Sequence, residues 1–267
     1  RDGFWTATRA VYDKINEHYK ARRSEHEVNL AAKQALVEKV TTLTSDQIVA
    51  MTTTQARALS SAQLNALDSA QLSAIETADI AAMTTAQISG LSSDSAAMLS
   101  TDQIVALSTA QVVALTSAQL NALDSDQIQA IETADLAALT TTQLSNLAAS
   151  SVAMLSTDQI VALTTAQAKV LTSAQLNAMD STQISAIETR DLVLITTAQL
   201  AGVDADSVAM LSTDQVAALT TAQVAALTTD QANALTTDQV ISLSTAQFKV
   251  LTSSQLNALD ADQVGAI

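Results

Sequence analysis

The sequence predicts an all-α solenoid, a superhelix of short capped helices with one helix for every eight residues, preceded by a longer helical segment. Three observations lead to this prediction: an eight-residue period that never slips, a helix-start signal in each period, and a composition suited only to a thin core. Hydrophobic residues make up 48% of the chain and aromatic residues only 2%. The core must therefore be built from Ala, Leu, Val, Ile and Met.

Residues 1–42 differ from the rest of the chain in charge and in aromatic content. They carry eight Lys or Arg against six Asp or Glu, whereas residues 43–267 carry four against 21. The two parts therefore have net charges of about +2 and −17 by counting. Four of the five Phe, Trp and Tyr residues and both histidines lie in the first part. We predict two units with different cores, residues 1–42 and residues 43–267, and we expect the acidic second unit to repel nucleic acid.

The first unit has a helical pattern. Its apolar residues recur three and four positions apart, and no Gly or Pro interrupts residues 4–40, which predicts one long helix or a hairpin that bends near Ser24. This stretch resembles the charged helical repeat of the domain-of-unknown-function family three hundred and forty-nine. The matching positions are Trp5, Tyr12, Tyr19, Asn29, Leu30, Lys33 and Leu36. The resemblance brings no known activity, and we expect this segment to serve as a helical cap or anchor for the repeats.

The second unit repeats every eight residues. From Leu43 to Ile267 every eighth residue is Leu, Ile, Met or Val, which gives 28 complete octets with the consensus L-[ST]-[ST]-x-Q-[ILV]-x-A. In a continuous α-helix the Leu position would drift by about 80° per octet and would face no fixed partner. In a continuous strand Leu and Gln would share one face. A helix that ends and restarts in each octet removes both objections.

Residues 219–224 illustrate the restart signal. If Thr220 is the N-cap, Gln223 lies at the third helical position, and the two side chains can form a capping box. Leu219 and Val224 then occupy the two positions of a hydrophobic staple. The second place of the octet holds Ser, Thr or Asp in 24 of 28 octets, and the fifth place holds Gln in 22. Each octet is therefore predicted to contain about one and a half helical turns.

A single octet is too small to fold alone. Ordering eight residues costs roughly 8 to 16 kcal/mol. One cap contributes about 1 kcal/mol, and burying two aliphatic side chains contributes about 3 to 6 kcal/mol. The octets must therefore stack and share their apolar residues, as in other repeat proteins.

A longer repeat of seven octets overlies the short one. Two sets of residues recur 56 positions apart: Glu76, Glu132 and Glu188, and Ser95, Ser151 and Ser207. The segment that begins at Leu243 instead matches the one from Leu163 at an offset of 80, so three octets are inserted before it. We therefore predict that the octet is the physical unit and that the block records a duplication. The number of octets per turn of the coil and its handedness stay open.

The candidate binding residues are few. His18 and His26 are eight residues apart, with Glu17, Glu25 and Glu27 nearby. Helical metal ligands favour a spacing of four, so this pattern predicts a solvated face rather than a metal site. Glu76, Glu132 and Glu188 replace neutral caps. We interpret them as variable caps, with weak surface binding of calcium as the alternative.

The octets also lack the residue types that most chemistry requires. They contain no His or Cys, so a catalytic triad cannot be assembled, and no Gly-rich phosphate loop or basic aromatic surface is present. No apolar run of about 18 residues predicts a membrane span. We predict no catalytic residue, no cofactor, no dedicated metal site and no nucleic-acid partner.

The octets resemble the LTTAQ-type octapeptide repeats of large repetitive bacterial proteins, which are usually taken to be surface or secreted structural proteins. The resemblance covers residues 43–267 and implies a non-enzymatic spacer, stalk or adhesin-like scaffold. It favours an extracellular or cell-surface location over a cytoplasmic one. A protein partner or self-association stays open. The alternative function is a binding module whose regular Thr/Ser or acidic surface engages ice, glycan or calcium.

Overall fold

The computed structural model describes residues 14, 17–23 and 39–266. Between Ser45 and Gly265 it contains 28 α-helices of four to six residues, one in each octet, and no strand. Residues 17–23 and 39–41 are also helical. The predicted all-α solenoid is confirmed, whereas the choice between one long helix and a hairpin near Ser24 falls outside the described residues.

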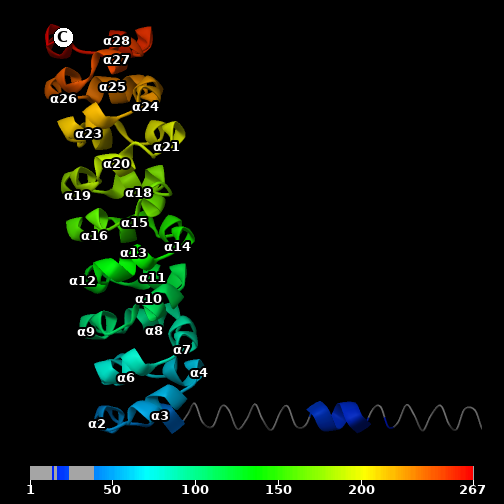
Figure 1. Ribbon diagram of the computed structural model, residues 1–267. Helices are drawn as coiled ribbons and strands as arrows, with labels where there is room; N and C mark the ends of the chain where they lie inside the picture. Colours follow the sequence, from blue (N-terminus) through cyan, green and yellow to red (C-terminus); the bar gives the residue numbers. More distant parts are fainter. Residues whose placement is uncertain (1–13, 15–16, 24–38, 267) are drawn as a thin grey trace, which may run out of the picture.

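The short helices form a single column (Figure 1). Helices in extensive contact are always three apart in chain order, as the pairs α8·α11 and α22·α25 show. Side-chain bonds also join α9 to the end of α5, four helices earlier, and helices seven apart, such as α9, α16 and α23, lie on the same side of the column (Figure 1). One turn of the coil therefore takes between three and four octets. The helices that are three apart form three series that wind slowly around the column, and we name these series stacks A, B and C.

Stack A contains α2 (Ser45–Val49), α5 (Ser69–Ser73), α8 (Ser93–Ala97), α11 (Ser117–Ala122), α14 (Thr141–Ser145), α17 (Thr165–Ala168), α20 (Thr189–Leu192), α23 (Thr213–Ala218), α26 (Thr237–Ser242) and α29 (Ala261–Gly265). Stack B contains α3 (Thr53–Ala58), α6 (Thr77–Ala82), α9 (Thr101–Val105), α12 (Ser125–Ala130), α15 (Ala149–Val152), α18 (Ser173–Ala178), α21 (Thr197–Ala201), α24 (Thr221–Ala226) and α27 (Thr245–Lys249). Stack C contains α4 (Ser61–Leu64), α7 (Thr85–Ser89), α10 (Thr109–Ala114), α13 (Thr133–Ala138), α16 (Thr157–Val161), α19 (Ser181–Ala186), α22 (Ala205–Ala209), α25 (Thr229–Ala234) and α28 (Ser253–Ala258).

Twenty-two of the 28 short helices start at the predicted capping box, and α24 shows its geometry. In α24 the N-cap Thr220 is extended, its backbone N–H donates to Gln223 Oε1 at 2.9 Å, and the Gln223 N–H donates to Thr220 Oγ1 at 3.2 Å. Leu227 ends the helix in an extended conformation, so the chain turns and the next N-cap follows at once. Because the first two places of the octet are not helical, the helix restarts in a new direction every eight residues.

The core is a thin apolar strip inside the column. It consists of the first and sixth places of successive octets, and it forms one cluster from Val40 to Leu251. Leu219 and Val224, the predicted staple, are 4% and 0% exposed. Each such pair is covered by the pairs one turn above and below, because an octet alone cannot bury its own apolar face.

Candidate functional site

The most regular polar feature of the molecule lies inside the column, at the fifth place of the octet. Gln103 is 1% exposed, and its Oε1 accepts from the Ser100 backbone N–H at 2.9 Å. Its Nε2 donates to the carbonyl oxygens of Leu72 and Ile75, at 2.9 and 2.7 Å. Those carbonyls lie at the end of α5, where a helix leaves its last C=O groups without partners. One side chain thus joins the start of its own helix to the end of a helix one turn below.

The same contacts recur along the column. Each side chain of this kind donates to the first-place carbonyl 28 residues earlier and to a second carbonyl 30 or 31 residues earlier. We call these side chains the bridging glutamines: Gln71, Gln87, Gln103, Gln111, Gln119, Gln127, Gln143, Gln159, Gln167, Gln175, Gln183, Gln199, Gln215, Gln223, Gln231, Gln239, Gln247, Gln255 and Gln263. Gln47, Gln55 and Gln63 of the first turn are not buried, and they cap their own helices.

The capping role of these glutamines was predicted from the sequence, but their role between turns was not. A signal for it was present in the residue type. Glu and Gln serve a capping box equally well, yet the fifth place holds Gln in 22 octets and Glu in none. An amide is required because the side chain must donate as well as accept, and a carboxylate has no hydrogen to donate.

Six octets interrupt this pattern. Their fifth place holds Asp79, Ser95, Asp135, Ser151, Asp191 or Ser207, and their helices, α6, α8, α13, α15, α20 and α22, lack a capping box. These octets come in pairs separated by a single Gln octet, which defines three interrupted segments: residues 75–98, 131–154 and 187–210. Each interrupted segment is joined to the turn below by one bridging glutamine, Gln87, Gln143 or Gln199. A run of three Gln octets, such as residues 99–122, uses three.

Asparagines replace part of the missing contact in the three octets whose fifth place is Ser. Asn121 Oδ1 accepts from the backbone N–H of Ala148 at 2.7 Å, and its Nδ2 donates to the Asn146 carbonyl at 3.1 Å. Asn65 and Asn177 make the equivalent bonds to the interrupted segments in their own blocks. The helix start that lacks Gln is therefore capped by a side chain from the turn below.

We expect Asn121→Ala to lower the free energy of unfolding by about 1 kcal/mol, because it removes two hydrogen bonds that are partly open to water. Urea unfolding followed by circular dichroism measures this change. Asn233→Ala is the matched control, since Asn233 occupies the same place of an octet but the N–H of Asp260 one turn above is bonded to Gln263. Equal losses in the two variants would contradict a capping role for Asn121.

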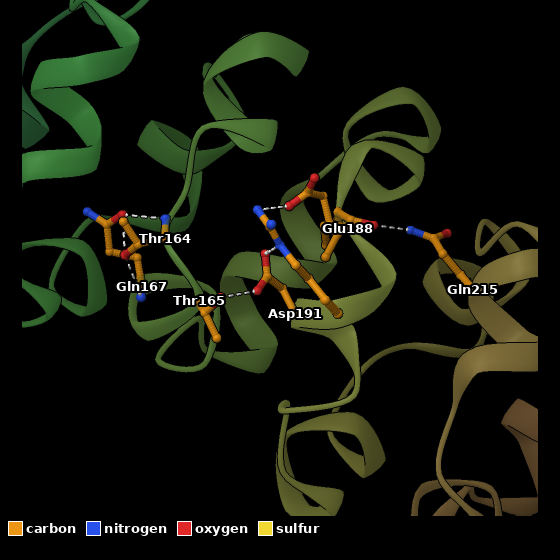
Figure 2. Close-up of polar contacts among 8 residues, drawn as sticks. Thr164, Thr165, Gln167, Glu188, Asp191 and Gln215 are labelled. Atoms are coloured by element: carbon orange, nitrogen blue, oxygen red, sulfur yellow. Dashed lines mark hydrogen bonds and ion pairs between the residues drawn. The ribbon is translucent and has the colours of Figure 1, made fainter.

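Glu188 and Asp191 lie close together in a charged cluster (Figure 2). Asp191 is 3% exposed, and its Oδ1 accepts from Thr165 Oγ1 at 2.7 Å. Arg190 forms ion pairs with Glu188 and with Asp191, the latter at 3.8 Å. The Arg190 side chain is 68% exposed, so these pairs add little to stability.

The equivalent cluster in the first block has no cation of its own. Ala78 stands where the third block has Arg190, and Asp79 is 2% exposed with an Oδ2 atom that has no hydrogen-bond partner. Burying a carboxylate oxygen without a partner is unfavourable. This octet is therefore a locally costly part of the core.

The three predicted glutamates precede helices that are seven apart in chain order. Glu76 is the N-cap residue of α6, Glu132 that of α13, and Glu188 that of α20. Helices seven apart lie on the same side of the column, as α9, α16 and α23 show (Figure 1). The glutamates therefore recur on one side of the column. None of the three makes a side-chain cap bond.

The predicted histidine pair is only half described. His18 and Glu17 are exposed in the helical residues 17–23. His26, Glu25 and Glu27 fall outside the described residues. Within the part of the chain that the structure describes, no group of three or more His, Asp or Glu side chains is arranged to hold a metal ion. No described helix is both long enough and apolar enough to cross a bilayer.

One exposed N-cap residue, Asp180, has a lowered side-chain pKa. The Thr182 hydroxyl donates to Asp180 Oδ1 at 2.6 Å and the Gln183 backbone N–H donates to the same oxygen at 2.8 Å, which holds the pKa of the Asp180 carboxyl below its ordinary value. A lowered pKa means that this cap is fully effective above the unfolded-state pKa. Its contribution is lost as the pH falls through the lowered value.

Two known protein families match parts of the chain. The ALTTAQ repeat matches residues 72–109, 104–130, 128–165, 184–221 and 217–245. The Domain of Unknown Function (DUF349) matches residues 1–63, which extends past the predicted boundary at residue 42 into the first octets. A search of curated proteins found no match. Both family resemblances seen in the sequence are confirmed.

Proposed function

This chain belongs to the ALTTAQ repeat family, and we propose that it serves as a non-enzymatic extended spacer, stalk or interaction scaffold. Neither matched family is an enzyme family. The observation that carries the proposal is the set of bridging glutamines, because it bonds each turn to the preceding one in the same way. A column bonded like this gains length in proportion to its number of octets.

The outer surface also supports a scaffold. In a typical octet such as residues 99–106, the third, fourth and seventh places are exposed, whereas the first, fifth and sixth are buried. The exposed places mostly carry Ser, Thr, Ala and Asp. The column therefore presents short, mainly polar side chains on all three stacks, and residues 1–42 are proposed to act as a cap or anchor at one end.

Small-angle X-ray scattering tests the spacer. Deleting residues 219–242 removes three octets, so we expect the maximum dimension to fall by the height that three octets occupy while the cross-section stays the same. Deleting three further octets should shorten the particle by the same amount. A globular envelope, or a cross-section that changes with the deletion, would contradict the proposal.

The alternative function is a binding module for ice, glycan or calcium. One observation favours it: Thr141, Thr165, Thr189 and Thr213 are exposed at the third place of octets that are three apart in chain order. Exposed hydroxyl groups therefore recur at regular intervals along the molecule. Absence of thermal hysteresis, together with a melting temperature that calcium shifts no more than sodium at equal ionic strength, would eliminate the ice and calcium versions.

A further inference from the structure

The interrupted segments share a second irregularity, in the packing of the core. An apolar cavity of about 10 Å³ lies beside Ser151 and is lined also by Leu120 and Ile131. A similar cavity of about 20 Å³ lies beside Ser207 and is lined also by Leu176. Leu120 precedes Ser151, and Leu176 precedes Ser207, by the same separation of 31 at which many bridging glutamines find an acceptor. Each cavity thus borders the place where a bridging glutamine would lie.

The helix starts are weak in the same segments. Five helices there, α6, α13, α15, α20 and α22, have no side-chain bond to their first turn. A missing cap, a missing bond to the turn below and a small cavity each lower local stability. Missing caps and missing glutamine bonds occur in all three interrupted segments, and the second and third segments also border a cavity. The octets between the interrupted segments keep every bridging glutamine.

We infer that the interrupted segments are yield points, at which the column opens first under heat, denaturant or tension. Stability in a repeat protein is the sum of each repeat and its contacts with its neighbours, so a local defect stays local. Residues 99–130, 155–186 and 211–266, the bridged segments, open later. For a spacer, this arrangement lengthens the molecule in steps rather than all at once. That use rests on the proposed function, whereas the order of opening does not.

Hydrogen exchange of the full chain, resolved to single amides, tests the order of opening. The sixth-place N–H of Val152 and that of Ile160 each donate to their own N-cap carbonyl, at 3.1 and 3.0 Å. These two hydrogen bonds have the same pattern and nearly the same length. A difference in exchange rate between the two amides therefore reports a difference in how often the two octets open. We expect Val152 to exchange at least about tenfold faster than Ile160, from the loss of roughly one to two net hydrogen bonds. Leu136 should likewise exchange faster than Ile128. Equal rates, or slower exchange at Val152 and Leu136, would overturn the inference.

Two variants test whether the missing glutamine causes the faster opening. In the first, Ala148→Ser and Ser151→Gln restore the consensus octet at the second yield point, and Asn121→Ala removes the asparagine that caps this octet in the wild type. We expect exchange at Val152 to slow about tenfold. Gln247→Ser creates an interruption within a bridged segment, so exchange at Phe248 should become about tenfold faster. If the restored octet folds with unchanged circular dichroism and Val152 still exchanges at its original rate, the glutamine is not the cause. If it does not fold, Gln247→Ser and the wild-type comparison decide the question.

Discussion

Replacing Gln159 by Glu is expected to lower the free energy of unfolding by about 3 to 5 kcal/mol, the loss typical of an uncompensated charge in a core. Gln159 is 1% exposed, and its Nε2 donates to the Ile128 and Ile131 carbonyl oxygens, both at 2.8 Å. Glu has the same size and keeps the acceptor for the Ser156 N–H. It replaces the donor with a negatively charged oxygen that faces two carbonyls.

Gln47→Glu is the matched control for this substitution. Gln47 forms the same capping box with Thr44, but its side chain is exposed. Its replacement should change stability by only a few tenths of a kcal/mol, because the first turn of a helix tolerates a carboxylate. Urea unfolding of both variants measures the difference. The penalty in Gln159→Glu should shrink as the pH is lowered, since protonation removes the charge and restores one donor. Equal effects of the two variants would show that the bonds between turns contribute little.

Leu171→Ala is expected to cost about 2 to 5 kcal/mol, the range for truncating a fully buried Leu. Leu171 is 0% exposed at the first place of its octet, where it belongs to the core that neighbouring turns share. The surrounding core is built of short aliphatic side chains, which can fill little of the space that Leu171 leaves. The loss should appear as a lower urea midpoint and as faster exchange confined to neighbouring turns.

Leu256→Ala gives the comparison for Leu171→Ala. Leu256 is the same residue type and lies at the sixth place of an octet in the last turns, but it is 37% exposed. Its truncation should cost less than about 2 kcal/mol, because part of the side chain is already in water. A loss at Leu256 as large as that at Leu171 would argue against the shared core.

Local signals made the helices predictable. The Thr220 and Gln223 pair predicts where α24 starts. The Leu219 and Val224 pair predicts which side of α24 is buried. The start and the buried side of this helix could therefore be derived from eight residues. The interactions of these two pairs are all within one octet or its immediate neighbour. The eight-residue period alone was enough to exclude a continuous helix or a continuous strand.

The coil could not be predicted in the same way. The number of octets per turn depends on the angle between successive helices, which packing sets and no single octet encodes. The contacts that define it join residues 28 to 31 positions apart, such as Gln103 with Ile75 and Leu72. The preference for Gln over Glu indicated that this side chain donates to a second partner. It did not indicate which carbonyl oxygen accepts the hydrogen bond. The role of Asn121 was hidden for the same reason, since its partner Ala148 lies 27 positions along the chain.

The arrangement of the turns gives the seven-octet block a physical meaning. Helices seven apart in chain order, such as α9, α16 and α23, lie on the same side of the column (Figure 1). Each duplicated block of 56 residues therefore repeats its interrupted octets on the same side, one block length further along the column. The three-octet insertion before Leu243 is not a whole block, so it rotates the octets beyond it relative to the earlier ones. Duplication of whole blocks can thus vary the length of the molecule without changing the side on which its interrupted octets lie.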